Sequence, residues 1–404
     1  MIREYTSDCV HCGFCLPTCP TYVLWREEMD SPRGRIHLMD ARLDGSIALN
    51  ATVATHFDRC LGCLACLSSC PSGVRYDRLI ESTRAAVEEE VERPLADRLA
   101  RDLVFRVLPY PSRMRVALRL APLGRALPGR LGAPARAAPR WRSAESVPAL
   151  TPASGERRAR VALLTGCVQS AVFSDVNAAT ARVLAADGYE VVAPPQGCCG
   201  ALSVHAGRLE EGKAFARAVI DAFEDVDLVV VNSSGCGSHL KELGWLLGDG
   251  RAEGFAARVR DVGELLAETE PRAPRHPLAV RVALQDPCHL RHAQRLPLSM
   301  QAALAGIPDL EVVEPAEQDL CCGSAGIYSV TQPEAARELG DRKAGHVVAT
   351  GAAVYASANP GCLVQIANAL RRAKSALPAV HPIELVDASI RGVPAGELRA
   401  SARR

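Results

Sequence analysis

Short apolar runs and amphipathic stretches alternate through the second half of the chain. β-branched runs such as VALLTGC (161–167) and DLVVVNSSGC (227–236) are separated by stretches with apolar positions at helical spacing, among them 174–188 and 210–225. Strands that alternate with helices of this length are typical of βαβ units and a parallel sheet. The pattern therefore predicts an α/β domain that begins near Val161.

This α/β pattern occurs twice. The runs VALLTGC, YEVVAPP, GCCG and DLVVVNSSGC are followed, in the same order, by VALQDPC, LEVVEPA, LCCG and AAVYASANPGC. Corresponding cysteines are offset by 121 to 126 residues, so the two copies differ only by small changes in loop length. Self-similarity of this kind indicates a duplicated unit. We predict a first Cys-Cys-Gly half at 159–280 and a second at 281–404, both built on parallel strands.

The N-terminal part of the chain follows another pattern. Dense cysteine runs occupy residues 1–75, and residues 76–100 show apolar positions at helical spacing, which predicts a helix. The stretch SPRGR (31–35) combines a favourable helix start with two arginines that are expected to face solvent or a partner's carboxylates. We predict an α+β ferredoxin-like module with a trailing helix at 1–100.

An arginine-rich segment joins this module to the α/β domain. From Leu103 to Ala144 the sequence holds nine arginines and no acidic residue, interleaved with Leu, Val, Pro and Ala. Residues 132–158 lack periodicity and are rich in Pro, Ala, Ser and Arg, which is typical of a linker. We predict a connector and linker at 101–158, whose positive charge suits either an anionic membrane surface or an acidic partner subunit.

Composition narrows the function. Lysine and arginine nearly balance aspartate and glutamate in the 404 residues, and the formal net charge of +1 argues against nucleic acid as a partner. The sequence shows neither an apolar signal segment nor 18 uninterrupted apolar residues, so we expect a cytoplasmic protein, with peripheral contact at the inner face of the cell membrane as a further option. Sixteen cysteines in that reducing compartment favour metal ligation or redox chemistry over disulfides.

Eight cysteines near the N-terminus form two copies of one motif. Both copies match C-x2-C-x2-C-x3-C-P residue for residue. Three closely spaced thiolates suit three corners of a cubane cluster, whereas the fourth cysteine ligates the other cluster of the pair. We therefore assign two [4Fe-4S] clusters, one to Cys9, Cys12, Cys15 and Cys70, and the other to Cys60, Cys63, Cys66 and Cys19. Structural zinc sites use four ligands in two separated pairs, a count that does not fit these motifs.

The residues between these cysteines also have expected roles. Pro20 and Pro71 end the two motifs and fix the chain after each fourth ligand. His11 is expected at the surface, because cysteine fills every ligand position. The apolar side chains of the motifs are expected to exclude water around the clusters or to join the core; they are Val10, Phe14, Leu61, Leu64 and Leu67.

Eight further cysteines form two sets of one layout, namely Cys167, Cys198, Cys199 and Cys236, then Cys288, Cys321, Cys322 and Cys362. They follow the C-terminal ends of predicted strands, where open α/β sheets place their ligand sites and where helix N-termini lower thiol pKa values. We treat them as candidate ligands for one or two additional Fe-S centres or another metal. Zinc, reactive thiols and inherited buried cysteines are alternatives. None of the nearby histidines is assigned as a ligand; these are His205, His239, His289 and His292.

Together these motifs resemble a known family. The stretches CVHCGFCLPTCPTY (9–22), SPRGRI (31–36) and DRCLGCLACLSSCPSGVRY (58–76), with the two Cys-Cys-Gly repeats, are similar to the iron-sulfur subunit of bacterial glycolate oxidase. The repeats alone are shared with heterodisulfide reductases, lactate-utilisation iron-sulfur proteins and the iron-sulfur subunit of anaerobic glycerol-3-phosphate dehydrogenase. In the heterodisulfide reductase pattern each repeat ends in C-x-x-C, whereas this chain has His239 and Gln365 at those positions.

The resemblance implies an electron-transfer subunit of an oxidoreductase complex. Flavin-binding oxidase subunits would oxidise glycolate to glyoxylate, and this chain would pass the electrons to a downstream acceptor, with a quinone at the membrane as one candidate. The sequence shows no G-x-G-x-x-G after a strand and no Walker-type loop, so we expect no flavin in this chain and assign no catalytic residue. The alternatives are the iron-sulfur subunit of D-lactate or glycerol-3-phosphate dehydrogenase, a heterodisulfide-reductase-like thiol enzyme, and a non-catalytic assembly protein.

Overall fold

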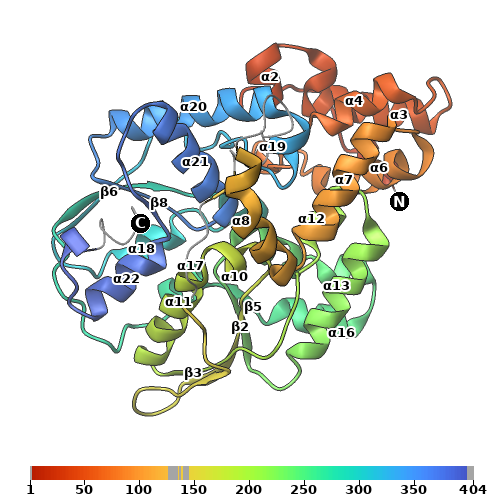
Figure 1. The fold of residues 1–404 in the computed structure, drawn as a ribbon. Helices are drawn as coiled ribbons and strands as arrows, with labels where there is room; N and C mark the ends of the chain where they lie inside the picture. Colours follow the sequence, from red (N-terminus) through yellow and green to blue (C-terminus); the bar gives the residue numbers. More distant parts are fainter. Residues whose placement is uncertain (1, 126–134, 136–137, 140–144, 398–404) are drawn as a thin grey trace.

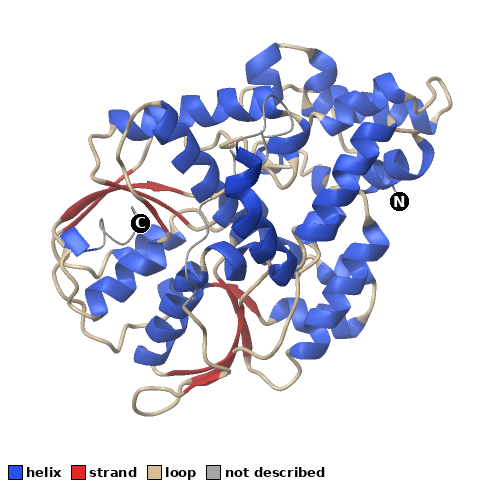
Figure 2. Cartoon of the chain, in the orientation of Figure 1, coloured by secondary structure: helices blue, strands red, loops and turns tan. Residues whose placement is uncertain are grey.

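The computed structural model describes residues 2–125, 135, 138–139 and 145–397. The helical N-terminal module lies at the upper right in Figure 1, where it contacts both α/β halves, and the α8 helix (Pro111–Arg125) runs over the face between the halves. Each half has its own sheet with helices around it (Figure 2). Among the helices described, none is long and apolar enough to cross a membrane.

The first half contains a five-stranded sheet in the order β1-β3-β2-β4-β5. All neighbouring strands are parallel except β1, which is antiparallel to β3. Val161 of β2 pairs with Val191 of β3 and with Leu228 of β4. The strands are β1 (Leu150–Thr151), β2 (Ala159–Leu164), β3 (Tyr189–Val192), β4 (Leu228–Val231) and β5 (Val259–Asp261).

The second half contains a four-stranded parallel sheet in the order β7-β6-β8-β9. Val282 of β6 pairs with Val312 of β7 and with Val354 of β8. The strands are β6 (Val280–Gln285), β7 (Leu310–Val313), β8 (Val354–Ser357) and β9 (Ala379–Val380). This order matches β3-β2-β4-β5 strand for strand, which confirms the predicted parallel strands and their duplication.

Helices connect successive strands in both halves, with two helical segments after the first strand and two after the second, but with three between β4 and β5 and one between β8 and β9. The first half contains α10 (Val168–Val172), α11 (Ser174–Ala186), α12 (Ala201–His205), α13 (Leu209–Ala222), α14 (Ser234–Lys241), α15 (Leu243–Leu247), α16 (Gly250–Ala257) and α17 (Val262–Glu268). The second half contains η2 (His289–Ala293), α18 (Ser299–Leu304), α19 (Tyr328–Thr331), α20 (Pro333–Ala349), α21 (Pro360–Arg372) and α22 (Pro382–Ile390). The helices predicted at 174–188 and 210–225 are therefore found as α11 and α13.

One hydrophobic core joins the two halves. Helix α11 packs on α22, and α17 packs on α18, so each contact pairs one helix from each half. Buried side chains of Val176, Val282 and Ile383 belong to the same cluster. Across this boundary Arg182 donates two hydrogen bonds, of 2.9 and 2.8 Å, to the Asp387 carboxylate. The cysteine-bearing ends of the two sheets are thus held in a fixed relation.

The N-terminal module is helical, so its predicted α+β character is wrong. Every regular element described between residues 2 and 125 is a helix: α1 (Ile2–Ser7), α2 (Pro20–Trp25), η1 (Glu28–Asp30), α3 (Pro32–Leu43), α4 (Ala51–Asp58), α5 (Ala65–Ser68), α6 (Tyr76–Glu90), α7 (Leu95–Val107) and α8. Side-chain caps start two helices between the motifs, because Ser31 accepts from the Gly34 N–H and Asn50 accepts from the Val53 N–H, each at 3.0 Å.

The trailing helix and the connector also differ from expectation. The helix predicted at 76–100 is divided into α6 and α7, because Pro94 lacks the N–H that a continuous helix would use. Within the predicted linker, β1 forms the edge strand of the first sheet. The connector residues 126–134, 136–137 and 140–144 lie outside the described residues.

Candidate iron-sulfur centres

An outer cavity is lined by four of the predicted ligands, Cys9, Cys12, Cys15 and Cys70, together with neighbours that include Val10, Phe14 and Cys66. The Cys12 side chain is exposed. Val10 and Phe14 are 69% and 65% exposed, so they do not shield the cavity from water as expected. This cavity therefore opens towards the molecular surface through an apolar rim.

An inner cavity is lined by the other four predicted ligands, Cys19, Cys60, Cys63 and Cys66, together with neighbours that include Leu61, Leu64 and Tyr76. All four cysteines, and the two leucines, are buried. Cys66 borders both cavities, so the two adjoin each other. The structure thus brings Cys70 to the first motif and Cys19 to the second.

The two motif loops bend at the same positions. In the first motif His11 and Gly13 have φ angles of 53° and 87°, and in the second Gly62 and Leu64 both have 62°. These left-handed residues immediately precede and follow the second cysteine of each motif. They turn the chain around that cysteine, so that three side chains separated by two residues face one cavity.

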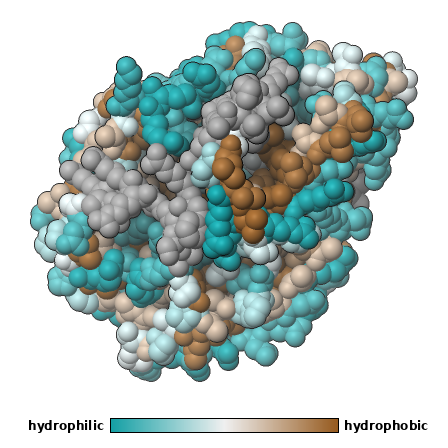
Figure 3. Space-filling model, in the orientation of Figure 1, coloured by the Kyte–Doolittle hydropathy of each residue, from teal (hydrophilic) through white to brown (hydrophobic). Residues whose placement is uncertain are grey.

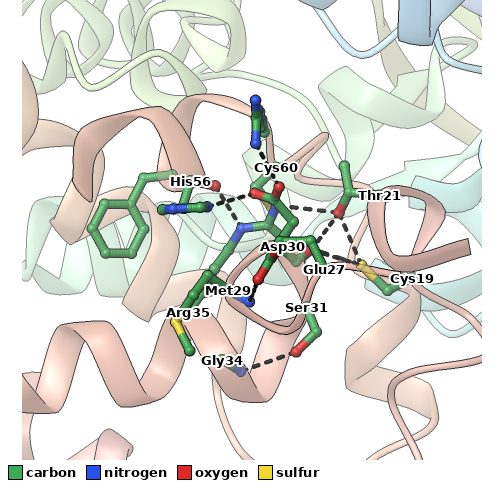
Figure 4. A network of polar contacts seen from close by, with 12 residues as sticks. Cys19, Thr21, Glu27, Met29, Asp30, Ser31, Gly34, Arg35, His56 and Cys60 are labelled. Atoms are coloured by element: carbon green, nitrogen blue, oxygen red, sulfur yellow. Dashed lines mark hydrogen bonds and ion pairs between the residues drawn. The ribbon is translucent and has the colours of Figure 1, made fainter. Parts of the chain in front are cut away.

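A buried ion-pair network lies against the inner cavity (Figure 4). The Arg35 side chain is 1% exposed and pairs with the fully buried Asp30 carboxylate at 3.5 Å. The guanidinium also lies 4.0 Å from Cys19 Sγ. Asp30 is held by two further partners, His56 at 2.9 Å and Arg59 at 2.8 Å. The expectation that this arginine faces solvent or a partner is therefore wrong, since its charge is used inside the module.

The thiols of the two cavities differ in their electrostatic surroundings. Burial alone would raise the pKa of Cys60, but the guanidinium groups of Arg35 and Arg84 outweigh burial and lower it below its usual value. In the outer cavity burial raises the pKa of Cys15 to about 11, and burial also raises that of Cys9. Burial also raises the pKa values of Cys63 and Cys66 in the inner cavity, so the effect of the two guanidinium groups is seen at Cys60.

The first thiol set follows β2, β3 and β4 and consists of Cys167, Cys198, Cys199 and Cys236. The Sγ atoms of Cys167 and Cys198 lie 3.5 Å apart, and the Cys199 thiol interacts with Cys198 and Cys236. Hydrogen bonds from Cys167 and Cys199 lower the pKa of Cys198. The four thiols thus converge, and none forms a disulfide.

The second thiol set has the same arrangement after β6, β7 and β8 and consists of Cys288, Cys321, Cys322 and Cys362. The Cys288 and Cys321 Sγ atoms lie 4.0 Å apart, and those of Cys322 and Cys362 lie 3.3 Å apart. Hydrogen bonds from neighbouring thiols lower the pKa values of Cys288 and Cys322. All four cysteines are free thiols.

Steric constraints require glycine after each cysteine pair. Gly200 and Gly323 have φ angles of +94° and +85°, which L side chains rarely adopt. A Cβ atom at Gly200 would lie 2.4 Å from the Gly212 carbonyl oxygen of α13, and one at Gly323 would lie 2.7 Å from the Ala336 carbonyl oxygen of α20. Glycine therefore lets a helix approach each cysteine pair closely.

The inner cavity adjoins the second thiol set. Burial raises the pKa of the Cys63 thiol, and the charge of nearby Cys288 raises it further. Leu61 and Leu320 belong to one hydrophobic cluster that also contains Cys63 and Cys321. The Ser68 hydroxyl and His292 Nδ1 form a 2.7 Å hydrogen bond across the same contact. Three of the four sites thus lie in succession: outer cavity, inner cavity, second thiol set.

Three histidines to which the sequence assigned no role link the two thiol sets. The ring centroids of His205 and His239 are 6.1 Å apart, and those of His205 and His289 are 5.5 Å apart. His289 contacts Cys288 Sγ at 3.7 Å, and His239 hydrogen-bonds the Cys199 backbone. In each ring Nε2 is buried and has no hydrogen-bond partner among the described residues. No sequence spacing indicates this cluster, because α12, α14 and η2 each contribute one ring.

The donor chemistry of these sites fits iron-sulfur groups. Thiolate sulfur is the usual protein ligand of such clusters. In each cavity the four predicted ligand cysteines line one space, with Cys66 bordering both, and in the thiol sets three pairs of sulfur atoms lie 3.3 to 4.0 Å apart. Buried cysteines that only filled the core would not need to converge in both halves.

Comparison with known proteins agrees with this geometry. Residues 5–74 match a 4Fe-4S dicluster domain, and residues 161–241 and 282–367 each match a Cysteine-rich domain. The probable glycolate oxidase iron-sulfur subunit of Bacillus subtilis is 36% identical, with 94% of this chain and 93% of the relative covered. The chain belongs to the family of glycolate oxidase iron-sulfur subunits.

Further comparisons describe the extent of the match. The glycolate oxidase iron-sulfur subunit of Escherichia coli is 37% identical and covers 95% of this chain and 93% of its own length. The family resemblance inferred from the motifs is therefore confirmed from end to end. A hypothetical protein from Helicobacter pylori has a related fold, with a TM-score of 0.50 at 10% identity over 89% of this chain and 68% of its own.

Proposed function

We propose that this chain is the electron-transfer subunit of a flavin-dependent 2-hydroxy acid dehydrogenase complex that oxidises glycolate to glyoxylate. The observation that carries the proposal is the succession of outer cavity, inner cavity and second thiol set along one line of contacts. Iron-sulfur clusters transfer single electrons, whereas oxidation of a hydroxy acid is a two-electron step that needs another cofactor. Substrate oxidation therefore belongs to a flavoprotein partner, and this chain carries the electrons away.

The two cavities support the ligand assignment made from the motifs. Cys9, Cys12, Cys15 and Cys70 hold one [4Fe-4S] cluster, and Cys60, Cys63, Cys66 and Cys19 hold the other. Each thiol set holds a further thiolate-ligated iron-sulfur centre, and convergence of the sulfurs in both halves supports this. The division into a module at 1–100, a connector at 101–158 and halves at 159–280 and 281–404 belongs to the same proposal.

The flavoprotein partner docks at the outer cavity. Cys12 is exposed there, and Val10 and Phe14 present apolar side chains beside it. An apolar patch next to a redox centre gives a partner both contact area and proximity to the electron acceptor. Electrons then leave from the far end of the succession towards a downstream acceptor, for which a membrane quinone is the candidate.

The test is anaerobic purification of the chain with its partner subunits, followed by substrate-dependent dye reduction. Glycolate is expected to support the highest kcat/KM, and D-lactate and glycerol 3-phosphate lower values. A complex that reduces dye with D-lactate or glycerol 3-phosphate but not with glycolate would overturn the substrate assignment. Reduction of a disulfide substrate by the isolated chain would instead favour the thiol-enzyme alternative.

A further inference from the structure

The helices α7 and α8 expose an apolar surface that the electron route does not use. On α7 the exposed fractions are 61% for Leu95, 59% for Leu99 and 63% for Leu103, and on α8 they are 53% for Val116, 56% for Leu120 and 75% for Leu123. We call these six side chains the leucine face. In Figure 3 the hydrophobic side chains over α7 and α8 form two arms on one side of the molecule.

Helical geometry explains why these side chains share a face. The α7 leucines follow one another at four-residue intervals, and the α8 members occupy positions i, i+4 and i+7, so each set forms one stripe. The opposite stripe of α8, with Met114 and Leu118, is buried against Ala171 of the first half. Helix α8 is therefore anchored by one side and exposes the other, whereas α7 is exposed all round at 95–100 and has its buried side chain, Phe105, near its C-terminal end.

Arginines border the leucine face. On α7 the acidic Asp97 falls on the opposite side of the helix, and Asp102, beside the stripe, pairs with Arg208 at 3.2 Å. At 100° per residue, Arg113 and Arg119 fall on either side of the α8 stripe, and Arg106 falls within the α7 stripe near its C-terminal end. The side chains of Arg106, Arg113 and Arg119 are exposed. From Leu103 to Arg125 the sequence contains no acidic residue. An apolar stripe bordered by arginines matches a surface that is apolar inside and anionic outside.

We propose that the leucine face docks this subunit onto the surface of an anionic lipid membrane. The face consists of leucine and valine alone, whereas the cores of protein interfaces are enriched in aromatic residues and methionine. Leucines flanked by arginines are instead the composition of helices that lie in the lipid interface. The inference extends the proposed function, because it places the electron-carrying subunit where lipid-soluble acceptors reside.

Vesicle flotation of the cluster-loaded full-length chain tests the proposal. The wild-type chain floats with phosphatidylcholine vesicles that contain phosphatidylglycerol, and added salt weakens this binding because it screens the arginines. Leu99→Gln combined with Leu120→Gln lowers the vesicle affinity about tenfold, since two apolar anchors are lost. The matched control is Val348→Gln on α20, which changes a side chain that is 44% exposed and lies outside the face.

A second variant separates charge from apolar contact. Arg106→Gln combined with Arg113→Gln weakens binding to anionic vesicles, and the wild-type chain binds pure phosphatidylcholine vesicles only weakly. Glycolate-dependent dye reduction in solution stays at the wild-type level in all variants, so a failure of the proposed function is recognised separately. The proposal is overturned if the wild-type chain does not bind anionic vesicles at low salt. It is also overturned if the leucine variant binds vesicles normally or loses its partner subunits instead.

Discussion

The outer and inner cavities are formed by the same cysteine motif, with left-handed residues at the same positions in both loops, yet their surroundings differ. The outer cavity has an exposed cysteine and an apolar rim in solvent, whereas all four cysteines at the inner cavity are buried. The inner cavity also has two guanidinium groups beside it and a second thiol set next to it. In the proposed function, the first copy of the motif is therefore the contact with the flavoprotein partner and the second copy is an internal relay.

The difference arises from what packs on each copy. The second motif lies against α19 and α20 of the second half through a shared hydrophobic cluster, and Arg35 and Asp30 fill the space behind it. The first motif has no such cover among the described residues. Burial alone disfavours added negative charge, but the nearby guanidinium groups stabilise it, as they do for the Cys60 thiolate, so the inner site is suited to hold an electron that enters at the outer one.

The largest effect is expected when either relay site loses a ligand. Cys63→Ser and Cys9→Ser each abolish electron transfer from the flavoprotein to a dye that accepts electrons only after the clusters, because the two cavities act in series. Flavin binding by the partner remains intact. The measurement is glycolate-dependent dye reduction by the purified complex, with Ser46→Ala, an exposed loop change, as the control. Full activity in both cysteine variants would show that electrons bypass the cavities.

The iron content distinguishes the cavities from the thiol sets. Two [4Fe-4S] clusters account for about 8 iron atoms per chain, and each further centre adds up to about 4. We expect the anaerobically purified chain to contain more than about 8 iron atoms. Replacing Cys198 and Cys199 by serine lowers this content by the contribution of one centre, as does replacing Cys321 and Cys322, whereas Ser203→Ala leaves it unchanged. A reproducible content of about 8 iron atoms per chain in all of these proteins would show that the thiol sets hold no iron. They would then bind zinc, act as reactive thiols or have a structural role.

The sequence predicts features that depend on one short stretch of residues better than features that depend on contacts between distant segments. The two cysteine motifs and the duplication with its parallel strands follow from spacing within short segments, and both could be inferred in advance, whereas the order of the strands was not predicted. The helical character of the N-terminal module was missed although caps such as Ser31 and Asn50 are local signals, because an expectation taken from ferredoxins was given more weight. The buried position of Arg35 was missed because its partner Asp30 shows no distinctive spacing.

The histidine cluster is a clearer example of contacts between distant segments that sequence spacing does not reveal. His205, His239 and His289 come from three helices, and only the folded halves bring them together. The sequence did mark His239, as the residue in place of an expected cysteine, but it gave no reason to group that histidine with the other two.

An intermediate effect is expected from the buried arginine. Arg35→Gln removes a positive charge beside Cys19 and Cys60, so the inner cluster becomes harder to reduce and its midpoint potential falls. Potentiometric titration monitored by electron paramagnetic resonance measures this shift. Arg35→Lys keeps the charge and restores most of the potential, which a purely structural role would not explain. The matched change Arg33→Gln affects a partly exposed pair with Glu28 and is expected to leave the inner potential unchanged. If the inner cluster has the same midpoint potential in all three variants, the charge of Arg35 does not tune that cluster, and the two cavities do not differ in this respect.

The smallest effect is expected at the apolar rim of the outer cavity. Phe14→Ser combined with Val10→Ser removes two side chains that are 65% and 69% exposed, so the free energy of unfolding should change by only about 0.5 kcal/mol or less. If the flavoprotein docks there, the apparent KM for the separately added partner rises several-fold, while the rate at saturating partner and the iron content stay near wild type. Val330→Ser, at a side chain that is 43% exposed outside the rim, is the control and leaves KM unchanged. An unchanged KM in the double variant would mean that the partner meets this chain elsewhere, and the exposure of Cys12 would then need another explanation.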